Sequence, residues 1–151
     1  MYRLERVVSG GQTGVDRAAL DSALFAGLDC GGWCPLGRRA EDGVLDPRYP
    51  LEETPSEDYE QRTEWNVRDS DGTLILASGP LTGGTALTDS LASKWSRPCF
   101  TVDLIHGPDI GAARAWLERE RIGTLNVAGP RESTLPGIYD RARAFLDKLF
   151  G

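Results

Sequence analysis

The sequence predicts an α/β domain in which helices cover both faces of a mostly parallel central sheet. Strand-like and helix-like segments alternate about five times along the 151 residues, as in parallel sheets with crossover helices. The apolar run 72–77 is typical of a strand buried on both faces of such a sheet. Glycine-rich turns follow two strands and lead into helices. We therefore expect one domain over residues 1–151.

The first third of the chain is predicted to contain two strands, one helix and a long loop. β-Branched residues favour a strand over 4–9. Small apolar residues at helical spacing predict a helix over 15–26, and Gly27 is placed to end it. A second short strand is expected within 29–35. The segment 37–55 is rich in glycine and proline, and irregular segments of this length are usually functional loops.

The rest of the chain continues the alternation of helix and strand. Ser56 is placed to begin a helix over 56–68, because two acidic residues follow it in the first turn. Pro136 suits the first turn of the closing helix. The other predicted elements are strands 72–77, 98–103 and 124–129 and helices 86–94, 110–121 and 135–150.

The overall charge narrows the choice of partner. The chain carries 17 Lys and Arg against 23 Asp and Glu, a formal net charge of −6. This balance argues against a nucleic acid or an anionic membrane as the main partner. No apolar run approaches the ~18 residues of a membrane-spanning helix, and the N-terminus does not resemble a signal peptide. We expect a cytoplasmic protein.

The three cysteines do not predict a disulfide framework or a metal centre. Their odd number argues against paired thiols. Cys30 and Cys34 are close in sequence, but a zinc site needs two further soft ligands, and only Cys99 and His106 remain. We expect buried or half-buried thiols and no metal held by protein side chains.

Three loops are predicted to meet at one edge of the sheet. They are 9–16 (the first loop), 78–85 (the second loop) and 129–134 (the third loop), and each follows a predicted strand. Ligands of parallel sheets bind beyond the carboxyl ends of the strands, where the strand order reverses. All three loops contain glycine together with Ser or Thr. The pattern indicates a shared site for a small anionic ligand.

The first loop combines a glycine-rich turn with the start of a helix. Backbone N–H groups there can approach an anion closely, and the helix N-terminus favours negative charge. Valine at Gly11 is expected to block this approach without unfolding the protein. Asp16 has three possible roles, because it could cap the helix, bind a ligand hydroxyl or order the loop. The candidate ligand-binding residues are Gly10, Gly11, Gln12, Thr13, Gly14 and Asp16.

The second loop repeats this chemistry. N–H groups and hydroxyls where a strand passes into a helix suit a phosphate or another oxyanion. One glycine-rich turn alone is weak evidence, but two after parallel strands favour a single anion site. The candidates in this loop are Thr82, Gly83, Gly84 and Thr85.

Three residues between these loops are further candidates. Trp33 offers an aromatic face and Arg38 a charge on the long loop, a combination that suits a planar ring bearing an anion. Alternatively, Trp33 belongs to the core and Arg38 pairs with nearby acids. Asn66 could hydrogen-bond a ligand, or it could be a buried and satisfied amide.

Four motifs carry a resemblance to a known family. GGQTGVDRAALD, CGGWCPLGRRAEDG, YPLEETPSEDYEQRTEWNVRDSDGTLIL and GPLTGGT resemble the molybdenum carrier family, in the same order and spacing. That family is related to YpsA-like proteins and to the wider group containing the LOG phosphoribohydrolases and DprA. The resemblance is dense over residues 7–103. It implies a Rossmann-like fold, a homo-oligomer, and a pocket for molybdenum cofactor (a phosphorylated pterin) or a nucleotide-like ligand.

One departure from the related LOG enzymes affects the expected chemistry. Their PGGxGTxxE motif supplies a catalytic glutamate. When the motif is aligned on Gly84 and Thr85, Thr88 stands in place of that glutamate. Asp89 is one residue further, about 100° away around the helix. Cleavage of a glycosidic bond normally needs a positioned carboxylate.

The function is therefore narrowed to three classes. The retained loops favour a binding or carrier protein. A nucleotide-processing hydrolase would need a carboxylate from elsewhere, and the catalytic candidates are Asp16 and Glu41, with Glu64 as a further source. A ligand sensor acting through a protein partner is the third class.

Overall fold

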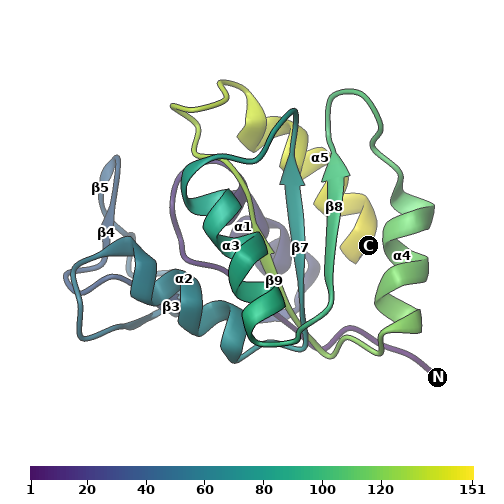
Figure 1. Cartoon of the computed structure of the whole chain (residues 1–151), viewed down its shortest axis with the longest axis horizontal. Helices are drawn as coiled ribbons and strands as arrows, with labels where there is room; N and C mark the ends of the chain where they lie inside the picture. The colour runs from purple at the N-terminus through teal and green to yellow at the C-terminus, as the bar shows by residue number, and fades with distance from the viewer.

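The computed structural model describes residues 1–151 as an α/β domain with a five-stranded parallel sheet (Figure 1). The strand order is β2-β1-β9-β7-β8. This confirms the predicted fold class. The strands are β1 (Arg6–Val8), β2 (Asp29–Gly31), β7 (Gly72–Ala77), β8 (Cys99–Asp103) and β9 (Thr124–Ala128).

Helices cover both faces of the sheet, as Figure 1 shows. The helices are α1 (Val15–Ala26), α2 (Tyr59–Arg68), α3 (Gly83–Lys94), α4 (Ile110–Arg119) and α5 (Ile138–Phe150). The helices α1, α4 and α5 pack on one face, where they enclose most of a core cluster of 26 buried residues. On the other face α2 and α3 pack together around Val67, Leu91 and Ala92.

Most predicted elements are present with shifted ends. Gly27 ends α1 in the left-handed conformation (φ 73°), as expected. The predicted strand 29–35 is interrupted by Gly32 at φ 124°, so that β3 (Trp33–Cys34) leaves the main sheet and pairs with β6 (Glu52–Glu53). The last helix begins three residues later than predicted, after Gly137 in the left-handed conformation.

The long loop 37–55 contains more order than its composition predicts. A short antiparallel hairpin forms from β4 (Arg39–Ala40) and β5 (Gly43–Val44). It projects beyond the edge of the sheet at the left of Figure 1. Arg38 holds the base of this segment through main-chain carbonyls. Its guanidinium donates hydrogen bonds to the carbonyl oxygens of Asp46, Tyr49 and Leu51, at 2.8 to 3.2 Å.

The strand order creates a switch point above β9. Strand β9 lies at the centre of the sheet, between β1 and β7. From β1 the chain continues to β2 at one edge of the sheet, and from β7 it continues to β8 at the opposite edge. The carboxyl ends of β1, β9 and β7 are therefore neighbours, and the first, third and second loops that follow them border one space.

The first and third loops pack backbone against backbone. Gly14 adopts φ 77° and ψ −128°, and a Cβ built on it would lie only 2.3 Å from the carbonyl oxygen of Pro130. The N–H of Val15 donates to the same carbonyl at 3.2 Å. A side chain at position 14 would push the two loops apart, so glycine is required there.

Candidate functional site

A cleft of about 780 Å³ lies over the carboxyl end of the sheet. All three predicted loops border it, and helix α2 supplies one wall. The volume lies in the range of cavities that bind cofactors and other small molecules. The predicted residues that line the cleft are Gly10, Gln12, Asp16, Asn66, Thr82, Gly83, Gly84 and Thr85.

Gln12 lines the cleft and carries a buried amide donor that has no partner. Its Oε1 accepts hydrogen bonds from the N–H groups of Thr13 (3.1 Å) and Glu41 (2.7 Å). Main-chain N–H groups only donate, so these two contacts fix which side-chain atom is oxygen. The residue is 4% exposed and its Nε2 has no hydrogen-bond partner. An acceptor atom of a ligand would relieve the cost of this buried donor.

A buried ion pair lies beside Gln12. Arg62 Nη1 lies 2.9 Å from Asp16 Oδ2, and their side chains are 11% and 8% exposed. The same Asp16 oxygen accepts from the N–H of Gln12 at 3.3 Å. Burial raises the pKa of the Asp16 carboxyl, and Arg62 acts against that shift. Helix α1 has no side-chain cap, so Asp16 does not cap it, and its contact with the N–H of Gln12 orders the loop.

The second loop leaves the first turn of α3 open toward the cleft. The first main-chain bonds of this helix run from the N–H groups of Thr85 and Ala86 to the carbonyl of Thr82, both at 3.2 Å. The N–H groups of Gly83 and Gly84 precede them and have no intrahelical acceptor. A Cβ on either glycine would meet nothing within 4 Å. These amides can therefore be approached by an anion.

The glycines of the first loop serve the protein's own packing. A Cβ at Gly10 would lie 1.7 Å from the Arg62 guanidinium. At Gly11, with φ 77°, it would lie 2.7 Å from Leu51. The expectation for valine at Gly11 is thereby corrected, since that substitution would disturb the fold instead of blocking a ligand. Gly11, Thr13 and Gly14 lie outside the cleft.

Trp33 and Arg38 are also outside the cleft. The Trp33 ring packs edge-to-face on Trp65, with centroids 4.8 Å apart, and its Nε1 donates to Asp69 at 2.9 Å. Arg38 is occupied by the carbonyls of the long loop. Asn66 lines the cleft, but its amide exchanges two hydrogen bonds with the main chain of Trp33, at 2.8 and 3.0 Å. Asn66 is thus the buried and satisfied amide of the second alternative. Trp33 is half-buried and lies outside the core cluster, and Arg38 binds carbonyls where pairing with nearby acids was the alternative.

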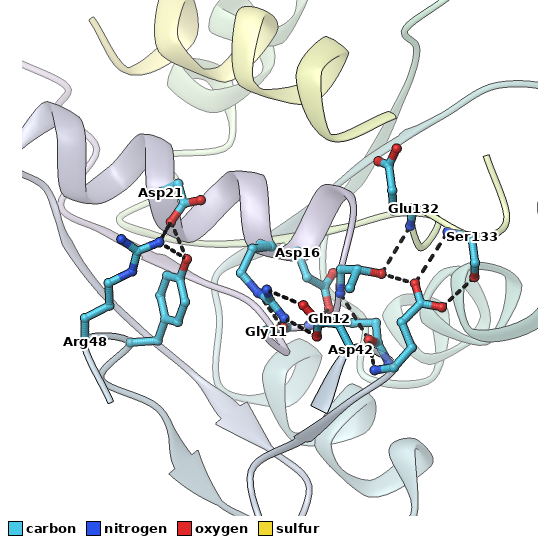
Figure 2. Close-up of polar contacts among 12 residues, drawn as sticks. Gly11, Gln12, Asp16, Asp21, Asp42, Arg48, Glu132 and Ser133 are labelled. Carbon is cyan, nitrogen blue, oxygen red and sulfur yellow. Dashed lines mark hydrogen bonds and ion pairs between the residues drawn. The ribbon is translucent and has the colours of Figure 1, made fainter. Parts of the chain in front are cut away.

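Glu41, one of the catalytic candidates, lies outside the cleft on the exposed hairpin tip. Its carboxylate accepts hydrogen bonds from the hydroxyls of Thr13 and of Ser133, the latter labelled in Figure 2. Glu64 is likewise absent from the lining and pairs with Lys94 at 2.7 Å.

Thr88, in place of the LOG glutamate, donates its hydroxyl to the carbonyl of Gly84 at 2.9 Å. Among the three carboxylate candidates, only Asp16 reaches the cleft.

Sequence analysis missed an aromatic and cationic edge of the cleft. Tyr59 and Arg131 both line it. The Arg131 guanidinium lies 5.0 Å from the centre of the Tyr59 ring, and that of Arg62 lies 5.3 Å away. Arg131 takes part in none of the ion pairs of the structure. Its position in the third loop, directly after a strand, was the available clue.

Neither the cysteines nor any other cluster forms a metal centre. All three thiols are free; Cys30 and Cys34 are buried and Cys99 is half-buried, as predicted. Burial raises the pKa of Cys99 to about 11, which keeps this thiol protonated. The structure has no group of His, Cys, Asp and Glu side chains that could hold a metal ion. None of its helices has both the length and the apolar character needed to cross a bilayer.

Comparison with known proteins identifies the family of this chain. The model of the circularly permutated YpsA SLOG family matches residues 7–150. The chain belongs to this family. The family assignment agrees with the resemblance found from the motifs, and it extends that resemblance over almost the whole chain. No curated protein matches the chain.

A solved structure resembles this YpsA-type chain over nearly its full length. It is the crystal structure of a "putative molybdenum carrier protein" from Syntrophus aciditrophicus SB. The two sequences are 44% identical, and the match covers 99% of this chain and 96% of the other, with a TM-score of 0.92. At this similarity the Rossmann-like fold is shared in full.

Replacing Asp16 by Asn tests the buried ion pair. The change leaves the Arg62 charge buried without its partner, so the free energy of unfolding is expected to fall by about 3–5 kcal/mol. Asp42→Asn is the matched control, because it breaks a pair between Arg17 and an exposed carboxylate. It should cost about 1 kcal/mol or less. Urea denaturation of both variants measures the difference, and equal losses would contradict the assigned role of Asp16.

Proposed function

We propose that this chain is a carrier or binding protein for a phosphorylated pterin or nucleotide-like ligand, with molybdenum cofactor as the leading candidate. The molybdenum carrier description of the 44% identical relative supports the carrier class. The unpartnered Nε2 of Gln12 carries the proposal for this particular cleft. A buried donor of this kind suits a ring carbonyl, a ring nitrogen or a phosphate oxygen.

The remaining walls of the cleft match the other parts of such a ligand. The free N–H groups of Gly83 and Gly84 suit a phosphate at the N-terminus of α3. Arg131, stacked on Tyr59 and without an acidic partner, adds positive charge and a planar surface for a ring. Together these groups supply hydrogen bonds and positive charge for a phosphate and a planar surface on which a heterocyclic ring can stack.

The donor set also fits a ligand that brings its own metal. Molybdenum cofactor holds its metal through the dithiolene sulfurs of the pterin, so a carrier need not contribute metal ligands. The residues of the cleft would bind the pterin and its phosphate and leave the metal with the ligands that it brings. This is compatible with the absence of a metal-binding side-chain group.

The first experiment identifies what the protein retains. The protein is purified without denaturation, its bound molecule is released, and mass spectrometry is combined with elemental analysis for molybdenum. A pterin with stoichiometric molybdenum is the expected result. An intact nucleotide without metal would contradict molybdenum cofactor as the ligand and favour the hydrolase or sensor class, with Asp16 as the first carboxylate to test for turnover.

Gln12→Met preserves the size of the side chain and removes the unpartnered donor, together with the Oε1 that accepts from Thr13 and Glu41. Retention of the bound molecule is expected to fall about tenfold, because one hydrogen bond from a buried donor is lost. Ser22→Ala is a matched control, since its buried hydroxyl also lacks a partner but lies outside the cleft. Mass spectrometry quantifies the retained molecule per mole of protein, and equal retention in both variants would count against the role of Gln12.

Gly84→Ala separates binding from stability at the second loop. The added methyl meets no protein atom within 4 Å, so the helix should be stabilised by up to about 1 kcal/mol. The same methyl would occupy the approach of an anion, so retention should fall. Gly111→Ala at the same position of α4 is the control, with similar stabilisation and unchanged retention. Thermal unfolding and mass spectrometry measure both effects, and full retention in Gly84→Ala would remove this loop from the proposed site.

A further inference from the structure

The tip of the β4–β5 hairpin is attached to two walls of the cleft at once. The Glu41 carboxylate accepts a hydrogen bond from the hydroxyl of Thr13, in the first loop. It also accepts from the hydroxyl of Ser133, in the third loop, at 2.5 Å, and from the N–H of that residue at 3.4 Å. Figure 2 shows Ser133 and Glu132 on the side of this network away from Arg48. Glu41 therefore connects segments that are distant in sequence.

The attachment is stable for electrostatic as well as geometric reasons. The hydroxyls of Ser133 and Thr13 lower the pKa of the Glu41 carboxyl, and the nearby positive charge of Arg131 acts in the same direction. The carboxylate thus keeps both acceptor oxygens at neutral pH. The adjacent Asp42 anchors the tip a second time through Arg17, at 3.0 and 3.1 Å (Figure 2).

The position of the hairpin tip determines which N–H groups donate to the side-chain amide of Gln12. The N–H of Glu41 lies 2.7 Å from Gln12 Oε1 and is its shorter contact. The other donor, the N–H of Thr13, belongs to the adjacent residue and lies at 3.1 Å. If the hairpin tip moved away, the amide would keep only this local contact and could rotate about its terminal torsion, which has broad and roughly two-fold preferences.

We propose that Glu41 is a positioning residue that fixes the orientation of the Gln12 amide and with it the place of the unpartnered Nε2. Glu41 does not line the cleft, so it acts through Gln12 and not on the ligand. The inference rests on the proposed function for the use of Nε2 by a ligand, whereas the fixed orientation of the amide is independent of it.

The first arm of the test needs no ligand. The side-chain amide resonances of Gln12 are assigned in a ¹⁵N-labelled protein by their loss in Gln12→Met. In Glu41→Ala they are expected to move toward the values of a free glutamine side chain. Glu41→Gln should restore much of the wild-type position, because its amide oxygen still accepts one hydroxyl. Ser133→Ala, at an exposed position, should give a smaller shift in the same direction.

Glu57→Ala is the control for loosening of the hairpin as a whole. It removes the exposed ion pair with Arg39, in β4, and leaves the tip untouched. The Gln12 resonances should not move in this variant. Unchanged resonances in both Glu41→Ala and Ser133→Ala, or an equal shift in Glu57→Ala, would overturn the proposal.

The second arm measures binding with guanosine 5′-monophosphate, which combines one phosphate with the aminopyrimidinone ring that pterins also contain. Titration calorimetry should show an affinity about tenfold lower in Gln12→Met, a similar loss in Glu41→Ala, and no further loss in the double variant. If the resonances shift but Gln12→Met binds as tightly as wild type, the positioning role stands and the proposed ligand contact fails. Additive losses would show that Glu41 does not act through Gln12.

Discussion

The buried pair of Asp16 and Arg62 is the interaction on which the cleft depends. It joins the first turn of α1 to the middle of α2, and hence the two helices on opposite faces of the sheet that approach the site. Its guanidinium occupies the space that a side chain at Gly10 would need. Its carboxylate also holds the N–H of Gln12. Two charges at this depth are tolerated because each supplies the partner of the other.

The two glycine-rich loops look alike in sequence but differ in what fills the space beside their glycines. In the first loop, atoms of Arg62, Leu51 and Pro130 occupy that space. A Cβ on Gly83 or Gly84 would have no atom within 4 Å apart from those of the adjoining backbone. Sequence analysis located both loops and the strand ends that gather them, because periodicity and turn composition are local properties. Which glycine faces a neighbour depends on packing between distant segments, so a motif alone could not separate the two cases.

The same distinction explains which other residues could be predicted. The apolar run 72–77 became β7 with its predicted ends, since a strand buried on both faces has few alternatives. Arg38 and Trp33 suggested a ligand by residue type, but their partners are carbonyls and side chains elsewhere in the fold. The sequence did not predict a role for Arg131, because its guanidinium lies over the ring of Tyr59, a residue far from it in sequence. An unpartnered donor such as Gln12 Nε2 can be recognised only when the positions of all neighbouring atoms are known.

The position of β9 has a consequence for how the molecule assembles. This strand lies in the middle of the sheet, where Leu125 pairs with Val7 on one side and with Gly72 on the other, yet it is the last strand in the chain. During synthesis the pairs β1–β2 and β7–β8 precede the strand that joins them, and each presents an open edge until then. The inner edges of these two strand pairs have no partner until residues 124–128 are synthesised, and only then can the sheet close.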